Sequence, residues 1–276
     1  MEQVLKTMLE NVRAKSPLVH NITNYVTVND VANVLLAAGG SPIMSDDADD
    51  VEDITSICGG LNINIGTLNK NTIPSMFLAG KKANALGHIV LLDPVGAGAS
   101  RLRTDTANRL MQEVRFDAVR GNISEIKTLC TGSGSTKGVD ADAVDAVTEA
   151  NLDDGVALVK AFARQAGCII AVTGAIDLVS DGERCWCIRN GRAEMSRITG
   201  TGCQLSALMT AFLVANPDRK LDAAAAAVCM MGLAGEIGWA NMQPGDGNST
   251  YRNRIIDAIF NMTGDALEEG AKYELR

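Results

Sequence analysis

The chain has 276 residues and a mass of 29.0 kDa, with 46% hydrophobic and 21% charged residues, which excludes a disordered or collagen-like protein. It carries 25 Lys and Arg residues against 33 Asp and Glu residues, and the formal charge of −8 argues against a nucleic-acid-binding surface. Seven scattered cysteines, most of them in apolar runs, are typical of reduced, buried thiols in a cytoplasmic protein.

Neither apolar segment that could suggest a membrane protein fits that class. Residues 1–14 carry Glu2 and Glu10 among apolar residues, which predicts an amphipathic helix and no signal peptide. The uncharged stretch 223–235 is shorter than the roughly 20 residues that span a bilayer. We therefore expect a buried helix there and a cytoplasmic protein with no membrane partner.

Short apolar runs alternate with longer segments of helical period, and this alternation predicts an α/β fold with a mostly parallel sheet. The expected strands are residues 18–20, 42–44, 62–65, 88–92, 118–120, 169–172, 178–180 and 185–189. Further helices are expected at residues 27–38, 74–86, 104–113, 154–165, 204–214, 222–240 and 252–269. The turn-forming segments 132–135 and 243–247 are too short to link domains, so we expect one domain over residues 1–276.

The last two expected strands flank Asp181 and Gly182, a pair typical of a tight turn. They therefore predict a hairpin that gives the parallel sheet an antiparallel edge.

The segment between this hairpin and the helix at 204–214 contains Gly200 and Gly202. Two glycines just before a helix allow several free amide groups to face one point, where the helix dipole adds positive potential. A phosphate group is the natural ligand, although a glycine-containing turn without a ligand explains the same residues.

Other polar residues stand where expected strands end. Asp93 follows an apolar strand and precedes a glycine-rich loop, where it could contact a metal or simply form a turn. Asn122 and Glu125 are three residues apart, so they could hold a hydrated Mg²⁺ or cap a helix. Thr173 directly follows a further expected strand. Together these strand ends suggest a site for Mg²⁺ and a polyphosphate, without the sequence of a P-loop or of a dinucleotide-binding Rossmann site.

Five motifs in the chain, spread over nearly its whole length, resemble those of one enzyme family. They are HNITNYV at 20–26, GSPIM at 40–44, DPVGAG at 93–98, RGNISE at 120–125 and TGTGC at 199–203. The combination resembles the ribokinase-like small-molecule kinases and, among them, the hydroxyethylthiazole kinase family. The resemblance implies a three-layer α/β/α fold and Mg²⁺-assisted transfer of the γ-phosphoryl group of ATP to the primary alcohol of 4-methyl-5-(2-hydroxyethyl)thiazole, in thiamine biosynthesis or salvage.

The resemblance also implies roles for individual residues. Those for the thiazole are Met44, Gly200, Asn24 and Val26, and those for ATP are Arg120 and Thr173. The metal-associated residues are Asp93, Asn122 and Glu125. The catalytic anion hole consists of Gly200, Thr201, Gly202 and Cys203. Similar kinases are homotrimers with sites between subunits, so Asn24 and Val26 are expected to reach a neighbouring subunit's substrate.

Cys203 stands where the wider ribokinase-like group has an Asp as presumed base. The amides of a helix start would favour its thiolate. Because phosphoryl transfer passes through a loose transition state, we expect Cys203 to orient the alcohol more than to remove its proton.

Three alternatives remain open at this stage. The same fold could serve a hydroxymethylpyrimidine kinase or a dehydratase that repairs hydrated nicotinamide cofactors, both of which would be expected to carry Asp at position 203. A metabolite-binding module that has lost its chemistry could also keep these residues.

Overall fold

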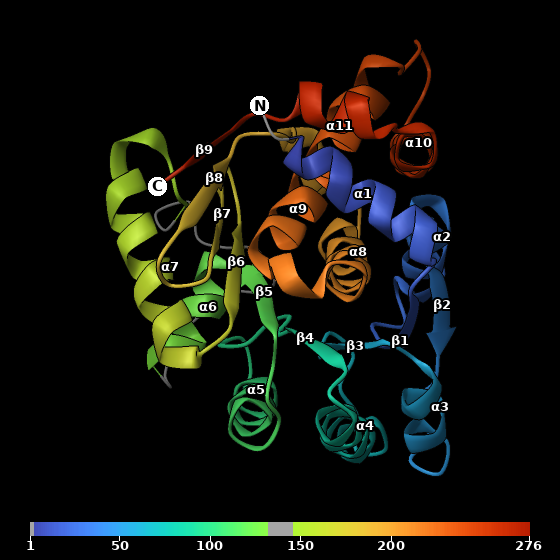
Figure 1. Ribbon diagram of the computed structural model, residues 1–276, viewed down its shortest axis with the longest axis vertical. Coiled ribbons are helices and arrows are strands. Elements are labelled where there is room, and N and C mark those ends of the chain that lie inside the picture. Colours follow the sequence, from blue (N-terminus) through green and yellow to red (C-terminus); the bar gives the residue numbers. More distant parts are fainter. Residues whose placement is uncertain (1–2, 132–145) are drawn as a thin grey trace.

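The computed structural model describes residues 3–131 and 146–276, and Figure 1 shows their strands in one sheet with helices on both sides. The strands are β1 (Leu18–Ile22), β2 (Ser41–Met44), β3 (Gly60–Asn64), β4 (Ile89–Asp93), β5 (Ala118–Asn122), β6 (Ile169–Thr173), β7 (Asp177–Ser180), β8 (Cys185–Ile188) and β9 (Tyr273–Leu275). The helices are α1 (Val4–Lys15), α2 (Val28–Ala38), α3 (Val51–Ile57), α4 (Thr72–Leu86), α5 (Arg101–Glu113), α6 (Ile123–Thr131), α7 (Leu152–Ala166), α8 (Thr201–Ala215), α9 (Lys220–Ala240), α10 (Asn248–Asn261) and α11 (Gly264–Gly270). The turn expected at 132–135 lies outside the described residues.

The sheet has the strand order β2-β1-β3-β4-β5-β6-β7-β8-β9. Neighbours from β2 to β6 pair in parallel, whereas the pairs β6–β7, β7–β8 and β8–β9 are antiparallel. The expected parallel sheet is therefore confirmed, and so is its antiparallel hairpin, formed by β7 and β8.

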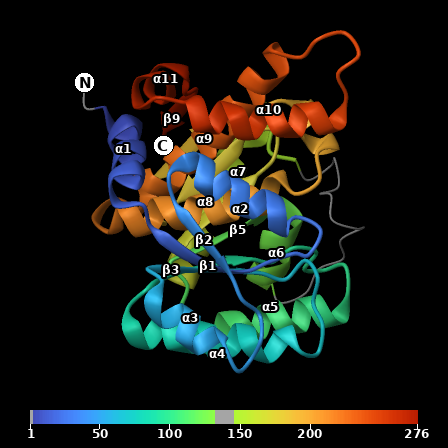
Figure 2. The same ribbon diagram turned by 90° about the vertical axis from the view of Figure 1, so that its right-hand side faces the viewer.

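Alternate residues of the central strands contribute to two separate cores, because successive side chains of a strand point to opposite faces. Leu91 packs in the core that includes residues of α1, α8, α9 and α10, whereas Val90 and Leu92 pack in the core that includes residues of α4, α5, α6 and α7. Figure 2 shows helices above and below the sheet. The three-layer α/β/α architecture implied by the resemblance is thus present.

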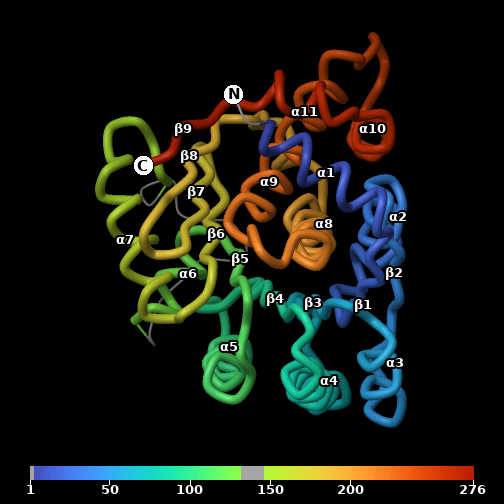
Figure 3. The backbone as a smooth tube through the Cα atoms, in the orientation of Figure 1, coloured from blue at the N-terminus to red at the C-terminus, as the bar shows by residue number. Residues whose placement is uncertain are grey.

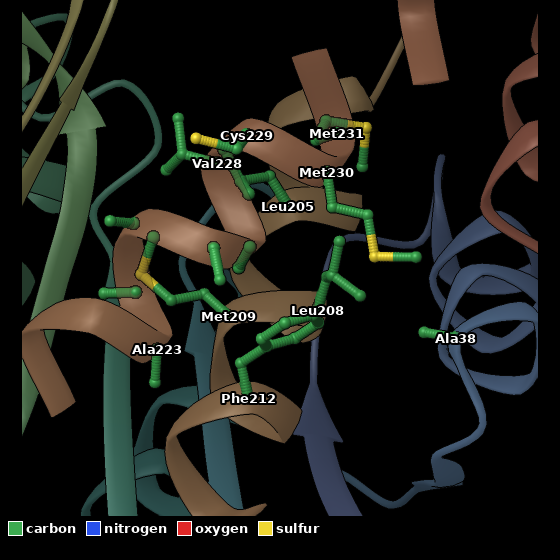
Figure 4. Close-up of a cluster of buried hydrophobic side chains, with 14 of the residues drawn as sticks. Ala38, Leu205, Leu208, Met209, Phe212, Ala223, Val228, Cys229, Met230 and Met231 are labelled. Carbon is green, nitrogen blue, oxygen red and sulfur yellow. The ribbon is translucent and has the colours of Figure 1, made fainter. Parts of the chain in front are cut away.

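Helices α8 and α9 fill much of the first core. Figure 4 shows Leu208 and Phe212 of α8 near Met230 of α9. The five consecutive alanines at positions 223–227 are all completely buried, so this part of α9 has no exposed face. Among the described residues, the segment Pro217–Ala240 has the length and composition of a membrane-crossing helix, but 78% of its most apolar window is buried inside the protein. The expectation of a buried helix is therefore confirmed.

The fold differs from the expectations in several places. The helix expected over 252–269 is two helices, α10 and α11, because the Thr263 side chain caps the start of α11 by accepting a hydrogen bond from the Ala266 amide. The short helix α3 and the edge strand β9 were not expected at all. Figure 3 shows β9 beside β8, and α1 near α9 and α11.

Candidate active site

The site residues predicted on three strands meet at one edge of the sheet. Asp93 ends β4, Arg120 is the third of the five residues of β5, and Thr173 ends β6. The parallel register places Asn64 beside Asp93 and Asn122 beside Thr173. In open α/β sheets this carboxyl edge is where ligands bind.

Helix α8 packs on β3 and β4 and begins at the predicted anion hole. Gly200 is its N-cap and has a φ of +84°, a left-handed conformation that favours glycine. A Cβ at this position would lie 2.1 Å from Cγ2 of Thr27. Thr201 and Gly202 are the first residues of the helix. The amide groups of a helix start have no partners within the helix, and together with the helix dipole they favour an anion.

The Arg120 guanidinium lies against this helix start. A Cβ at Gly202 would be only 2.5 Å from Nη1 of Arg120. Nη2 donates a hydrogen bond of 2.6 Å to Oγ1 of Thr173, and Nη1 is 3.6 Å from Oδ2 of Asp93. The guanidinium and the positive end of α8 therefore lie side by side, an arrangement suited to phosphate oxygens.

Asp93 is completely buried, and its two carboxylate oxygens differ in their surroundings. Oδ2 accepts hydrogen bonds from Nδ2 of Asn64 at 2.7 Å and from Oγ of Ser206 at 2.8 Å. Oδ1 is buried without a hydrogen-bond partner among the described residues. Burial raises the pKa of Asp93, and the nearby Arg120 charge is the largest influence that lowers it. Oδ1 is thus an oxygen available to a ligand or a Mg²⁺ ion.

Asn122 and Glu125 form a reciprocal capping box at the start of α6. The Asn122 amide donates to Oε2 of Glu125 at 2.8 Å, and the Glu125 amide donates to Oδ1 of Asn122 at 2.9 Å. Oε1 of Glu125 accepts a hydrogen bond from the Gly96 amide at 2.8 Å. Burial, followed by the Asp93 charge, raises the pKa of Glu125 to about 7. The capping alternative is therefore present. Because the carboxylate oxygens of Glu125 and Oδ1 of Asn122 already accept hydrogen bonds, they could contact a hydrated ion through its water molecules.

No ready-made metal cluster accompanies these residues. In the part of the chain that the structure describes, no group of three or more His, Cys, Asp and Glu side chains is arranged to hold a metal ion.

Cys203 lies in the first turn of α8 and is 6% exposed. Its Sγ accepts a hydrogen bond from Nδ2 of Asn64 at 3.2 Å. Burial, followed by the Asp93 charge, raises the pKa of Cys203 to about 11. Burial and the Asp93 charge therefore outweigh the groups that favour the charged thiolate.

Met44, predicted to contact the thiazole, belongs to the surroundings of the cluster that contains Cys203. It ends β2 and packs against an apolar cluster that contains Val19, Val95 and Cys203. The predicted thiazole residue and the predicted catalytic thiol therefore belong to one part of the site.

Asn24 and Val26 lie on the β1–α2 loop (residues 23–27). Oδ1 of Asn24 accepts a hydrogen bond from the Val26 amide at 2.9 Å, and its Nδ2 would lie 2.5 Å from a Cβ at Gly66. The Val26 side chain is 67% exposed. A pocket of about 590 Å³ borders this loop, lined by residues that include Tyr25, Asp46 and Asn69. The loop is therefore exposed at Val26 and borders this pocket through Tyr25.

Three residues contact the site that the sequence analysis did not single out. Asn64 and Ser206 bind Asp93, and we call Asn64, Asp93, Cys203 and Ser206 the buried polar layer. Arg103 of α5 donates from Nη1 to the Val95 carbonyl at 2.9 Å and from Nη2 to the Gly66 carbonyl at 2.8 Å. The position of Asn64 at a strand end could have identified it, whereas the sequence near Arg103 carries no signal for these contacts.

The fold is that of the ribokinase-like small-molecule kinases. The solved ADP complex of Bacillus subtilis pyridoxal kinase aligns with a TM-score of 0.59 over 80% of this chain and 91% of that chain, and its 15% identity supports the fold alone.

The chain belongs to the hydroxyethylthiazole kinase family, whose profile matches residues 9–265. Hydroxyethylthiazole kinase of Clostridium acetobutylicum is 57% identical over 98% of this chain and 99% of its own length. That of Clostridium beijerinckii is 48% identical over 97% of this chain and 96% of its own. The solved hydroxyethylthiazole kinase of Pyrococcus horikoshii OT3 aligns with a TM-score of 0.87 and 32% identity, covering 99% of this chain and 98% of that one. The chain is therefore a kinase, which transfers a phosphoryl group.

Proposed function

We propose that this kinase transfers the γ-phosphoryl group of ATP to the primary alcohol of hydroxyethylthiazole, and that its product serves thiamine biosynthesis or salvage. Family membership supports the acceptor. The observation that carries the proposal is the meeting of the Arg120 guanidinium and the start of α8 beside Asp93. Met44 packs against the apolar cluster that contains Cys203. Residues 1–276 act as one domain in this proposal.

The anion hole and Arg120 stabilise the charge of the transferred group. Amides at the start of α8, from Gly200 to Cys203, are assigned to the phosphoryl oxygens, and Arg120 contacts the ATP phosphates. Thr173 holds the guanidinium in place through its 2.6 Å hydrogen bond. Because these groups are fixed before the reaction, they stabilise developing charge without reorganising.

Cys203 orients the acceptor alcohol. With a pKa of about 11, the thiol is protonated at neutral pH and is a poor proton acceptor. A loose transition state keeps the hydroxyl proton on the alcohol until late in the transfer, so a strong base is not needed. Met44 and Gly200 then place the thiazole ring beside this thiol.

Asp93 is the residue that would hold Mg²⁺ directly, through its unpartnered Oδ1. Asn122 and Glu125 would contact the hydrated ion through water, since their oxygens hold the capping box together. When bound, the ion supplies positive charge to the ATP phosphates.

We further propose a cytoplasmic homotrimer in which Asn24 and Val26 reach the substrate of a neighbouring subunit. The 67% exposure of Val26 and the 57% exposure of Tyr25 in a single chain support this arrangement. The seven free cysteines support a reducing compartment. Light scattering of the purified protein tests the trimer, and a monomeric active enzyme would exclude it.

The test of the reaction is an ATP-consumption assay with Mg²⁺ that offers hydroxyethylthiazole and hydroxymethylpyrimidine side by side, with products identified by mass. Thiazole phosphate alone is expected. Pyrimidine phosphate, or no product from either alcohol, would contradict the proposed substrate.

A further inference from the structure

Asn64 lies at the centre of the buried polar layer and is 1% exposed. Its Nδ2 donates to Oδ2 of Asp93 at 2.7 Å and to Sγ of Cys203 at 3.2 Å. Its Oδ1 accepts a hydrogen bond from the Gly66 amide at 2.8 Å. One side chain therefore contacts both the acid on β4 and the thiol on α8.

The orientation of this amide group follows from its partners. A backbone amide can only donate, so Oδ1 must face Gly66, and the two N–H groups of Nδ2 are left for Asp93 and Cys203. A flipped amide would place N–H against N–H and oxygen against carboxylate. Because the site is buried, either mismatch would leave polar groups unsatisfied at considerable cost.

These contacts also determine which oxygen of Asp93 is free. Asn64 and Ser206 both bind Oδ2, and Oδ1 remains without a hydrogen-bond partner among the described residues. Without Asn64, the Asp93 carboxylate would keep only its hydrogen bond from Ser206, and a single hydrogen bond would not prevent the carboxylate from rotating. The same loss would release one hydrogen bond that fixes Sγ of Cys203.

We propose that Asn64 is a positioning residue for phosphoryl transfer, which holds the Asp93 carboxylate and the Cys203 thiol in a fixed relation so that Oδ1 of Asp93 stays available to the reacting groups. This inference rests on the proposed roles of Asp93 and Cys203. It assigns to Asn64 an effect on turnover beyond its contribution to stability.

Asn62 provides the matched control. It lies two residues earlier on the same strand, is also completely buried, and donates from Nδ2 to Oδ1 of Asn21 at 3.1 Å. No hydrogen bond links it to the buried polar layer in the described residues. Replacement of either asparagine by leucine removes one buried amide from β3.

The experiment compares kcat, KM for ATP and the thermal unfolding midpoint of wild type, Asn64→Leu and Asn62→Leu. The midpoints of both variants are expected to fall, and that of Asn64→Leu falls further because Asn64 takes part in three side-chain hydrogen bonds and Asn62 in one. For Asn64→Leu, kcat falls about thirtyfold to a hundredfold while KM for ATP changes less than about threefold, because misplacement of reacting groups acts on turnover. For Asn62→Leu, kcat stays within about threefold of wild type. Equal losses of kcat in the two variants would overturn the proposal.

Asn64→Ser covers the case in which leucine prevents folding, since a smaller polar side chain fits the same space and cannot reach both partners. Its kcat is expected to fall about tenfold or more, and wild-type turnover would overturn the proposal.

A crystal structure of whichever Asn64 variant folds tests the positioning role without any substrate. We expect a rotated Asp93 carboxylate or a displaced Sγ of Cys203, and unchanged positions of both would overturn the positioning role. If the wild-type enzyme forms no thiazole phosphate, the proposed function fails. The crystal structure of the variant would still show whether Asn64 positions Asp93 and Cys203.

Discussion

The buried polar layer and the β1–α2 loop belong to opposite parts of the proposed site and are built in opposite ways. In the layer, Asp93 and Asn64 are at most 1% exposed and hydrogen-bonded to side chains of the same chain. On the loop, Val26 and Tyr25 are 67% and 57% exposed. The side proposed for phosphoryl transfer is therefore preorganised within one chain, whereas the side proposed for the acceptor remains open.

This difference predicts where substitutions will have large effects. Fixed, water-excluded groups stabilise developing charge most strongly, so changes near the layer should reduce turnover. Exposed side chains lose little when truncated, so changes on the loop should alter acceptor binding by small factors. Five substitutions test this contrast, from the largest expected effect to the smallest.

Gly200→Ala should lower kcat at least a hundredfold, because its Cβ would meet Thr27 and displace the amides of the anion hole. Gly245→Ala is the control. Gly245 has a similar φ of +94° but no atoms within 4 Å of a Cβ, so it shares only the backbone strain. Steady-state kinetics of both variants measure the difference, and similar turnover in the two would mean that the anion hole is misplaced.

Glu125→Gln should change how stability depends on pH. Because the pKa of Glu125 is raised to about 7 in the folded protein, its contribution to stability is fully present below the unfolded pKa and is lost as pH rises through 7. The loss amounts to at most about 3 kcal/mol between pH 4.5 and 7. Urea unfolding across this range should show a flatter profile for Glu125→Gln than for wild type or Glu113→Gln, an exposed control. Parallel profiles for all three would contradict the raised pKa.

Arg120→Ala should lower kcat/KM for ATP about thirtyfold, the effect of losing a charge-assisted contact of about 2 kcal/mol. The KM for the thiazole alcohol should change less than about threefold. Arg101→Ala is the control, since the Arg101 side chain is 95% exposed. Normal kinetics with ATP in Arg120→Ala would remove Arg120 from the site.

Cys203→Ala should lose at most about tenfold in turnover, the low end of general-base contributions, because a thiol with a pKa of about 11 orients the alcohol. Single-turnover measurements at saturating substrates would separate this step from product release. A loss of several thousandfold would show that Cys203 is an essential base.

Val26→Ala should raise KM for the thiazole alcohol about threefold and leave KM for ATP unchanged, since truncation removes two methyl groups from one side of the acceptor site. Leu102→Ala, at a similarly exposed position on α5, should change neither constant. An effect on ATP use in Val26→Ala would contradict the division between the two sides.

The strand-end residues were predictable because their positions follow from local pattern. An apolar run that ends in Asp93 or Thr173 predicts both the strand and the edge at which its last side chain lies, once the sheet is known to be parallel. Asn64 carried the same signal. It was missed because the predicted strand extended one residue further, to position 65, which placed Asn64 inside the strand.

Contacts between distant segments were not predictable in this way. Arg103 binds the carbonyls of Gly66 and Val95, which lie on two different loops, and no short-range pattern marks such a contact. The raised pKa of Cys203 was not predictable for a related reason. The helix start is visible in the sequence, whereas burial and the charge of Asp93 depend on tertiary packing.

The alanine run at positions 223–227 has a consequence for mutational scanning. Each of these side chains is completely buried, so a larger residue would have to displace a neighbouring helix or strand. Alanine-to-valine changes, usually scored as mild, should therefore reduce protein abundance here as much as truncations do in other cores. A mutational scan that measures only cell growth would score substitutions in this segment like substitutions of catalytic residues. A parallel measurement of protein abundance would distinguish loss of folded protein from loss of catalysis.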